Sequence, residues 1–195
     1  MSINFILYKP FGVLSQMTSN DPKEKNKTFL SMVFDFPEGI MPVGRLDEKS
    51  EGLLLMTTDG KLSDWINRSG IEKEYFVQLD GTITEEALDT LRHGVDIGLS
   101  GGIYKTAPCP VKMMREEPSL PSPSPKLRIG MHRPASWIAI TLREGKYRQV
   151  RKMTAAVGFP TLRLVRVRIG HLRLGSMVPG EVQKVDISEI QSLKA

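Results

Sequence analysis

The chain of 195 residues lacks most features of extracellular, metal-binding and membrane proteins. Cys109 is its only cysteine, which excludes an internal disulfide and a cysteine-rich zinc site and suits a reducing cytoplasm. The histidines lack ligand spacing, so we expect no metal at His93, His132 or His171. The opening apolar run, residues 3–8, is too short for a signal-peptide core, and no later run could span a membrane. We therefore expect a cytoplasmic protein without a membrane anchor.

Basic residues are in excess. Lys and Arg together number 27 against 22 Asp and Glu, which gives a net charge of +5 and a pI near 9.3. This excess favours a polyanionic partner such as nucleic acid, although a surface charged only for solubility has a similar composition. A hydrophobic content of 40% is enough for one sizeable domain or for two small lobes that share a core.

Segments with strand character outnumber those with helical character. Branched and aromatic residues between turn signals predict strands at 4–9, 53–57, 75–80, 103–113, 137–143, 162–169 and 181–186. One helix is predicted at 61–68, and a second begins after the capping residue Thr84 and stops at Gly94. The segment 117–134 contains five prolines and predicts a long exposed loop, either an inert linker or a loop that contacts substrate.

A basic segment follows Glu144. The sequence EGKYRQVRKMTAAVGFP predicts a helix that stops at Gly158 and Pro160. Its apolar stripe consists of Val150, Met153 and Val157. Its opposite side carries Arg148, Arg151 and Lys152, which could be merely a solvated face. The next strand adds further arginines, and alternation places Arg166 on the same face as Leu164. This face of the strand therefore changes from apolar to cationic along its length. Such a change is expected of a strand that enters a phosphate-binding groove.

The segment GRLDEKSEGLLLMTTDG, residues 44–60, contains the strongest candidate for chemistry. Arg45 and Asp47 lie two positions apart, so in an extended chain both side chains project to the same side. A neighbouring guanidinium keeps a carboxylate ionised, as a nucleophile or a base requires, but an ordinary surface ion pair has the same two residues. A glycosidase would also need a second carboxylate as its acid, and the nearby candidates are Glu48, Glu51 and Asp59.

The same segment resembles the signature of the RsuA-type pseudouridine synthases, G-R-L-D followed by three variable positions and G-L-L. Three further family blocks match in order, YKPFGVLS at 8–15, KEYFVQLDG at 73–81 and EGKYRQVRKM at 144–153. Departures are small, because Tyr8 stands where Asn is usual and Lys152 replaces an Arg. The chain resembles the E-type branch, which modifies large-subunit rRNA. The features that carry this resemblance are the proline-rich insert and the lack of a small basic RNA-binding module before the first block.

The resemblance implies an α+β fold, with a long, mainly antiparallel mixed sheet, flanking helices and a central cleft. It implies one catalytic domain, residues 1–195, made of two lobes and without an N-terminal accessory module. The implied activity is the isomerisation of a specific uridine in a 23S rRNA stem-loop to pseudouridine, by a monomer that needs no cofactor. The alternative of a different class is an RNA-binding protein without chemistry, which would not need Asp47.

The resemblance also implies roles for single residues. Asp47 is the expected nucleophile, Arg151 its orienting ion-pair partner with Arg148 as the rival, and Tyr75 the aromatic that stacks on a flipped uracil. Tyr75 could instead be a core tyrosine of a sheet face. Arg45 is expected to enter the space that the flipped base leaves. The other expected substrate contacts are Lys73, Leu164, Arg148, Lys152 and Arg166, and Leu164 could equally be an ordinary core residue.

Overall fold

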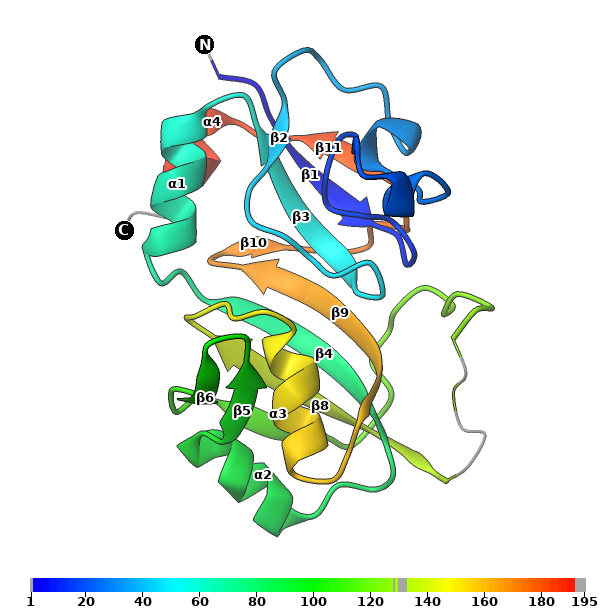
Figure 1. Cartoon of the computed structure of the whole chain (residues 1–195), viewed down its shortest axis with the longest axis vertical. Helices are drawn as coiled ribbons and strands as arrows, with labels where there is room; N and C mark the ends of the chain where they lie inside the picture. The colour runs from blue at the N-terminus through cyan, green and yellow to red at the C-terminus, as the bar shows by residue number, and fades with distance from the viewer. Residues whose placement is uncertain (1, 128, 130–132, 192–195) are drawn as a thin grey trace. The chain divides into compact units, whose positions relative to one another are not determined.

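The computed structural model describes residues 2–127, 129 and 133–191. The chain forms two compact units (Figure 1). The first unit contains the chain up to Ile71 and the chain from Arg166 on, and the second contains Glu72–Val165. Strand β9, Thr161–Ile169, contributes to both units because the boundary falls between Val165 and Arg166.

The first unit is built around strand β3, Glu51–Thr57, every residue of which is buried. β3 pairs antiparallel with β1, Asn4–Lys9, which in turn pairs with β11, Val182–Lys184. The short strands β2, Met41–Pro42, and β10, Leu172–Arg173, pair with β3 and β9. The apolar run of β3 agrees with a strand covered on both faces. One face packs in a core of Leu7, Val13, Leu30, Ile40, Leu54 and Met56.

Short helices complete the first unit. Helix α1, Gly60–Arg68, begins after Asp59, whose carboxylate accepts hydrogen bonds from the backbone N–H groups of Lys61 and Leu62. This cap satisfies donors that the first helical turn leaves without partners. Two 3-10 turns, η1 at Pro22–Glu24 and η2 at Leu30–Met32, lie between β1 and β2, and α4 covers Ile187–Gln191.

The second unit contains three paired strands in the order β4, Lys73–Asp80, then β8, Ala135–Leu142, then β7, Val111–Met114. Both pairings are antiparallel. Strands β5, Asp96–Leu99, and β6, Gly102–Lys105, form a separate antiparallel hairpin. Helices α2, Glu85–His93, and α3, Gln149–Ala156, contribute buried residues to the same core as β4 and β8.

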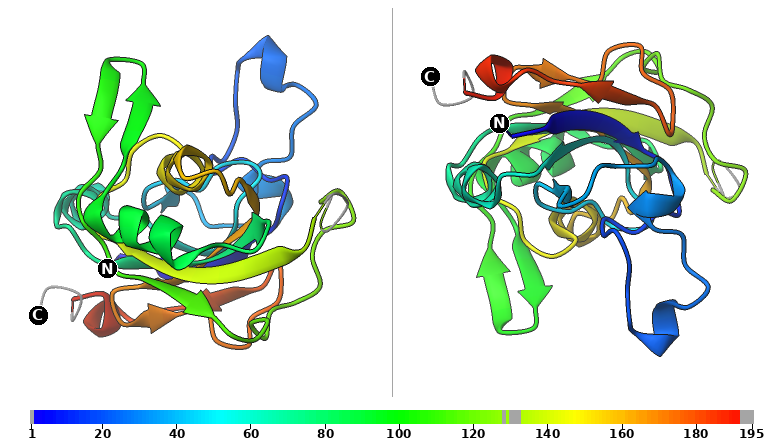
Figure 2. Two further views of the ribbon diagram at one scale, coloured as in Figure 1. Left: turned by 90° about the horizontal axis from the view of Figure 1, so that it is seen from below. Right: turned by 90° about the horizontal axis from the view of Figure 1, so that it is seen from above.

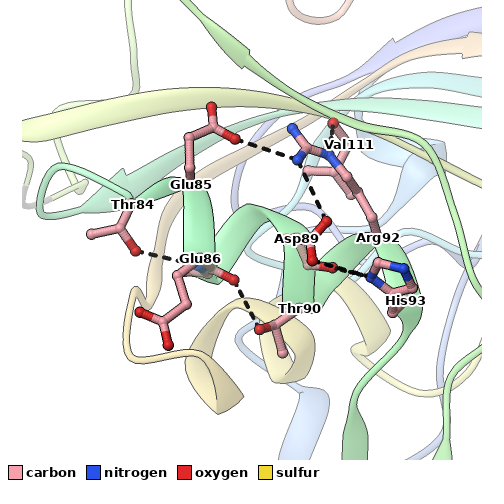
Figure 3. Close-up of polar contacts among 9 residues, drawn as sticks. Thr84, Glu85, Glu86, Asp89, Thr90, Arg92, His93 and Val111 are labelled. Atoms are coloured by element: carbon pink, nitrogen blue, oxygen red, sulfur yellow. Dashed lines mark hydrogen bonds and ion pairs between the residues drawn. The ribbon is translucent and has the colours of Figure 1, made fainter.

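Helix α2 shows how local chemistry fixes an element (Figure 3). The Thr84 hydroxyl accepts a hydrogen bond from the Ala87 amide at 3.2 Å, and acidic residues occupy the first turn. At the other end, Arg92 Nε donates to the Val111 carbonyl of β7 at 3.0 Å. Gly94 ends the helix with a φ of 86°, and a Cβ there would meet the Thr106 carbonyl oxygen at 2.2 Å. The expected cap and stop of this helix are therefore confirmed.

Two expected elements were wrong in their bounds. The single strand expected at 103–113 is two strands, β6 and β7, because Pro108 and Pro110 lack the N–H groups that a continuous ladder needs. The basic helix begins at Gln149 rather than after Glu144, and Arg148 has left-handed backbone, with a φ of 52°. Residues 144–148 form a loop in which the Lys146 amide donates to the Gln149 side chain at 2.9 Å.

The other expected strands and helices are confirmed within two residues at each end, apart from 181–186, of which β11 covers only the middle. Among the described residues of 117–134 there is no helix or strand, and Arg163 of β9 donates to the Pro121 carbonyl at 2.9 Å. Positions 128 and 130–132 of this segment lie outside the described residues. The cleft expected between two lobes remains a prediction.

Candidate active site

Asp47 lies in the connection between β2 and β3. The Val43 amide donates to the Leu55 carbonyl at 2.7 Å, and the Ser50 amide donates to the Asp47 carbonyl at 3.0 Å. The second bond closes a four-residue turn with Asp47 in its first position, where aspartate is favoured. Asp47 is half-buried, while its neighbour Leu46 is buried. The turn therefore holds the backbone of Asp47 in place while the residue stays partly exposed.

The segment YKPFGVLS holds both neighbours of Asp47. Ser15 Oγ donates to the Leu46 carbonyl at 2.7 Å and accepts from the Leu46 amide at 3.0 Å. On the other side, the Gly12 amide donates to the Glu48 carbonyl at 2.8 Å. These contacts, which join residues more than 30 positions apart, explain why the two sequence blocks occur together. Sequence reasoning assigned no role to Ser15 or Gly12, although the matched block contained both.

Lys9 is a fully buried amine beside this turn. Its Nζ donates to the carbonyls of Val13 at 2.7 Å, Pro10 at 2.9 Å and Glu48 at 3.5 Å. Burial lowers the pKa of Lys9 to about 7, although the carboxylates of Glu51, Asp47 and Glu48 act in the opposite direction. Lys9 thus adds a third link between the first block and the residue that follows Asp47. Only the block match could have indicated it, because a lysine in a strand gives no sign that it is buried.

Arg166 lies inside the first unit, only 3% exposed. Its Nε donates to the Leu53 carbonyl at 2.7 Å, and no described group bonds its buried Nη2. The Gly52 backbone passes so close that a Cβ would lie 2.3 Å from the Arg166 carbonyl oxygen, and its φ is 102°. Glycine is therefore required at this position of the motif. The alternation of β9 predicted a cationic face, but this guanidinium is bonded to backbone, and its RNA contact remains a prediction.

Arg45 is exposed and lines a hollow of about 360 Å³. The other lining residues are Ser15, Gln16, Met17, Pro42, Gly44 and Asn67. Ser15 thus contacts Leu46 and also lines the same hollow as Arg45. Arg45 and Ser15, which bonds the residue before Asp47, therefore lie in one region of the first unit.

Tyr75 and Leu164 belong to the same apolar cluster of the second unit. Leu164 is 4% exposed and is part of the buried core, as its ordinary packing role predicts. Tyr75 of β4 lies opposite Ile140 of β8, is half-buried and packs against that core. Lys73 begins the same strand, opposite Leu142. Tyr75 is thus partly a core residue, with part of its surface still accessible.

The basic residues of α3 are half-buried rather than fully solvated. Arg151 Nη1 donates to the Thr161 carbonyl at 3.3 Å, and Lys152 Nζ donates to the Gly98 carbonyl at 2.6 Å. Arg148 is the residue before the helix, so it is not part of the expected helical face. The pairing of Asp47 with Arg151 or Arg148 joins residues of different units and stays a prediction.

The described residues contain no group of three or more side chains that could hold a metal ion, and His132 is not among them. No helix in the described part of the chain is long and apolar enough to cross a bilayer.

The profile of the family described as RNA pseudouridylate synthase matches residues 4–156. The chain belongs to this family. The match includes Asp47, Tyr75 and Arg151 and therefore spans the catalytic residues expected from the sequence. The activity that defines this family of synthases is the isomerisation of uridine in RNA.

Named relatives agree with this membership. The chain is 43% identical to "Ribosomal large subunit pseudouridine synthase E" of Xanthomonas axonopodis pv. citri over 89% of each chain. It is 38% identical to the synthase of the same name in Vibrio parahaemolyticus, over 93% of this chain and 73% of the relative. The resemblance to the E-type branch is thereby confirmed.

A solved pseudouridylate synthase has the same fold. Its crystal structure superposes with a TM-score of 0.78 at 28% identity, over 99% of this chain and 74% of the other. An H/ACA RNP structure with bound substrate RNA gives a TM-score of 0.53 at 13% identity, which is evidence for the fold alone. The expected α+β fold with a mainly antiparallel sheet is confirmed.

Proposed function

We propose that this synthase converts one uridine of large-subunit rRNA, within a 23S stem-loop, to pseudouridine. The observation that carries this proposal is the 43% identity to a ribosomal large-subunit synthase over 89% of both chains. The net charge of +5 suits a polyanionic substrate. We further propose that the protein acts in the cytoplasm as a monomer. Sedimentation equilibrium tests the monomer, which has a mass of 21.8 kDa.

Asp47 is the proposed nucleophile. In the reaction the bond between uracil N1 and the ribose breaks, the uracil turns, and its C5 bonds to the ribose carbon. C5 then loses its proton, and N1 gains one. The carboxylate could attack the ribose carbon, add to the uracil ring or remove a proton, and each route requires its ionised form. The half-buried position of Asp47 and the hydrogen bonds to both of its neighbours support this role.

The target uridine must leave the base stack before Asp47 can reach it, at a cost of roughly a few kcal/mol. We propose that Arg45, which is exposed, fills the vacated space. The accessible part of the Tyr75 ring stacks on the flipped uracil, and Leu164, which belongs to the same apolar cluster, closes the apolar wall of the pocket. Arg151 or Arg148 orients the carboxylate. Lys73, Lys152 and Arg166 complete the proposed substrate contacts.

The deciding experiment compares wild type with Asp47→Asn on an rRNA fragment. Both proteins should bind the RNA, and only wild type should form pseudouridine. Formation of pseudouridine by Asp47→Asn would contradict the proposed nucleophile, and binding without any product in wild type would favour the non-catalytic alternative. Free uracil as product would instead indicate a glycosylase. Mapping of pseudouridine in rRNA from cells that lack the gene identifies the target, because one signal should disappear.

A further inference from the structure

The second unit has an exposed surface at hairpin β5–β6 and the loop before α3. Figure 2 shows the hairpin projecting from the sheet of its own unit, and strand β5 contacts helix α3. Ile103 on β6 is 82% exposed, and Tyr147 in the loop is 74% exposed. The site described above includes neither residue.

Each of two tyrosine rings on this surface lies near a lysine ammonium. Lys146 Nζ is 4.6 Å from the centre of the Tyr104 ring, and Lys152 Nζ is 5.1 Å from the centre of the Tyr147 ring. We call these four residues the tyrosine–lysine surface. The hydrogen bond from Lys152 to the Gly98 carbonyl joins α3 to the hairpin at 2.6 Å. The surface therefore combines two aromatic rings, each with a lysine ammonium near its face.

Glu144 holds residues of this surface through hydrogen bonds. It accepts hydrogen bonds from the Tyr104 hydroxyl at 2.6 Å, the Ala107 amide at 3.0 Å and the Gln149 side chain. Burial raises the pKa of Glu144, but these hydrogen bonds and Lys146 outweigh it and hold that pKa below its ordinary value. The carboxylate is thus engaged by partners within the protein. Lys146 is the lysine that acts on this carboxylate, whereas Lys152 forms no ion pair with another described residue, so the surface keeps a positive character.

The loop backbone is also held in one conformation. Arg148, the residue after Tyr147, has a φ of 52°, which non-glycine residues adopt only when their surroundings enforce it. The bonds of Gln149 to Lys146 and Glu144 supply such enforcement. A rigid loop keeps the Tyr147 ring exposed without the entropy loss of ordering a flexible one on binding.

Aromatic rings beside cations suit one class of partner in particular. Unpaired nucleotides offer bases that stack on aromatic rings and phosphates that attract lysines. An acidic protein segment would use the lysines but would leave the rings without a matching partner. The excess of basic residues in the whole chain favours nucleic acid as well.

We propose that the tyrosine–lysine surface binds unpaired nucleotides of the substrate RNA outside the reacting uridine. A base stacks on Tyr147, and Lys146 and Lys152 contact adjacent phosphates. This inference rests on the proposed function, because its ligand is the RNA on which the synthase acts. It extends the proposed substrate contact of Lys152 to a second RNA contact that raises affinity without taking part in the reaction.

The test uses the full chain and a fluorescent rRNA stem-loop with single-stranded flanks. Tyr147→Ala should weaken binding about ten-fold. It should also raise KM with little change in kcat, because the contact is equal in ground and transition states. Tyr147→Phe keeps the ring and should restore tight binding. Log affinity falls as log salt concentration rises, and Lys146→Ala should make this fall shallower by a slope of about one, because one phosphate contact is lost. Lys112→Ala, an exposed lysine of β7, is the matched control.

Unchanged RNA binding and KM in Tyr147→Ala would overturn the inference, including the case in which this surface binds a protein. A fall in kcat without a rise in KM would also overturn it, because Tyr147 would then act on the reaction itself. Failure of the proposed function is distinct, because wild type would then bind the RNA without forming pseudouridine. The direct binding measurement would still decide the role of Tyr147.

Discussion

Ser15 Oγ bonds both backbone polar atoms of Leu46, donating to its carbonyl at 2.7 Å and accepting from its amide at 3.0 Å. Leu46 precedes Asp47, and the carbonyl of Glu48 on the other side accepts from Gly12. The carboxylate is therefore carried by a backbone that is fixed on both sides. Such support affects catalysis without a contact to substrate, so Ser15 is a positioning residue.

Ser15→Ala removes both bonds and leaves two buried backbone groups without partners. We expect the free energy of unfolding to fall by about 1–3 kcal/mol. We also expect kcat to fall on the order of ten- to a hundred-fold with a smaller change in KM, because the carboxylate is displaced. Urea unfolding and steady-state kinetics measure the two effects. Ser31→Ala, which removes an exposed bond to the Met17 carbonyl, should change neither kcat nor KM. A normal kcat in Ser15→Ala would show that the turn at Asp47 keeps its conformation without the two bonds of Ser15.

Lys9 predicts a specific pH dependence of stability. Burial lowers its pKa from 10.5 to about 7, so between these values the unfolded chain binds a proton that the folded chain lacks. Stability therefore rises with pH in this window, and the cost of burying the charge is greatest below pH 7. Compared with Lys9→Met, wild type should gain up to about 1.4 kcal/mol in unfolding free energy for each pH unit from 7 to 9.

Chemical unfolding of both proteins at several pH values measures this difference. The control is Lys25→Met, at an exposed lysine, whose difference from wild type should stay constant over the same range. A constant difference for Lys9→Met as well would mean that the buried amine keeps its ordinary affinity for protons.

Gly52→Ala should be severely destabilising. A Cβ would lie 2.3 Å from the carbonyl oxygen of Arg166 in backbone with a φ of 102°. Strain and overpacking together should cost roughly 3 kcal/mol or more, which calorimetry would detect as a lower Tm. Gly60→Ala is the matched control, because a Cβ there meets nothing within 4 Å. A Tm of Gly52→Ala close to that of wild type would mean that β3 and β9 can separate without cost.

Conservative substitutions can decide between Arg151 and Arg148 as the partner of Asp47. Lysine keeps the charge but loses the planar fork that binds a carboxylate through two hydrogen bonds. We expect Arg151→Lys to lower kcat at least ten-fold and Arg148→Lys mainly to raise KM. Single-turnover kinetics separate the two effects. The reverse pattern would assign the orienting role to Arg148.

Local signals predicted most of the elements. Thr84 and Gly94 bound α2 as expected, because capping and left-handed glycine are properties of a few adjacent residues. Strand β1 has the expected bounds for a similar reason, since Lys9-Pro10 ends it. The helix start at Gln149 could not be predicted, because it depends on contacts of Glu144 with Tyr104 and Ala107, about 40 positions away.

The sequence predicted the motif that contains Asp47. It did not predict the buried side chains that pack around this motif. The block that contains Asp47 identified the family, because its spacing is specific. Alternation along β9 indicated the face on which Arg166 lies, but it could not say that the face is buried. The burial of Lys9 was equally hidden, because only the assembled fold supplies its three carbonyl acceptors.

The bond from Arg163 to the Pro121 carbonyl has a consequence for the length of the proline-rich segment. Arg163 is 2% exposed, so it anchors the start of that segment to a buried position of strand β9. Insertions or deletions after Pro121 then alter only the entropy of closing a surface loop. This entropy changes slowly with the number of residues in the loop. Related synthases can thus carry very different insertions after this tether while strand β9 keeps its place.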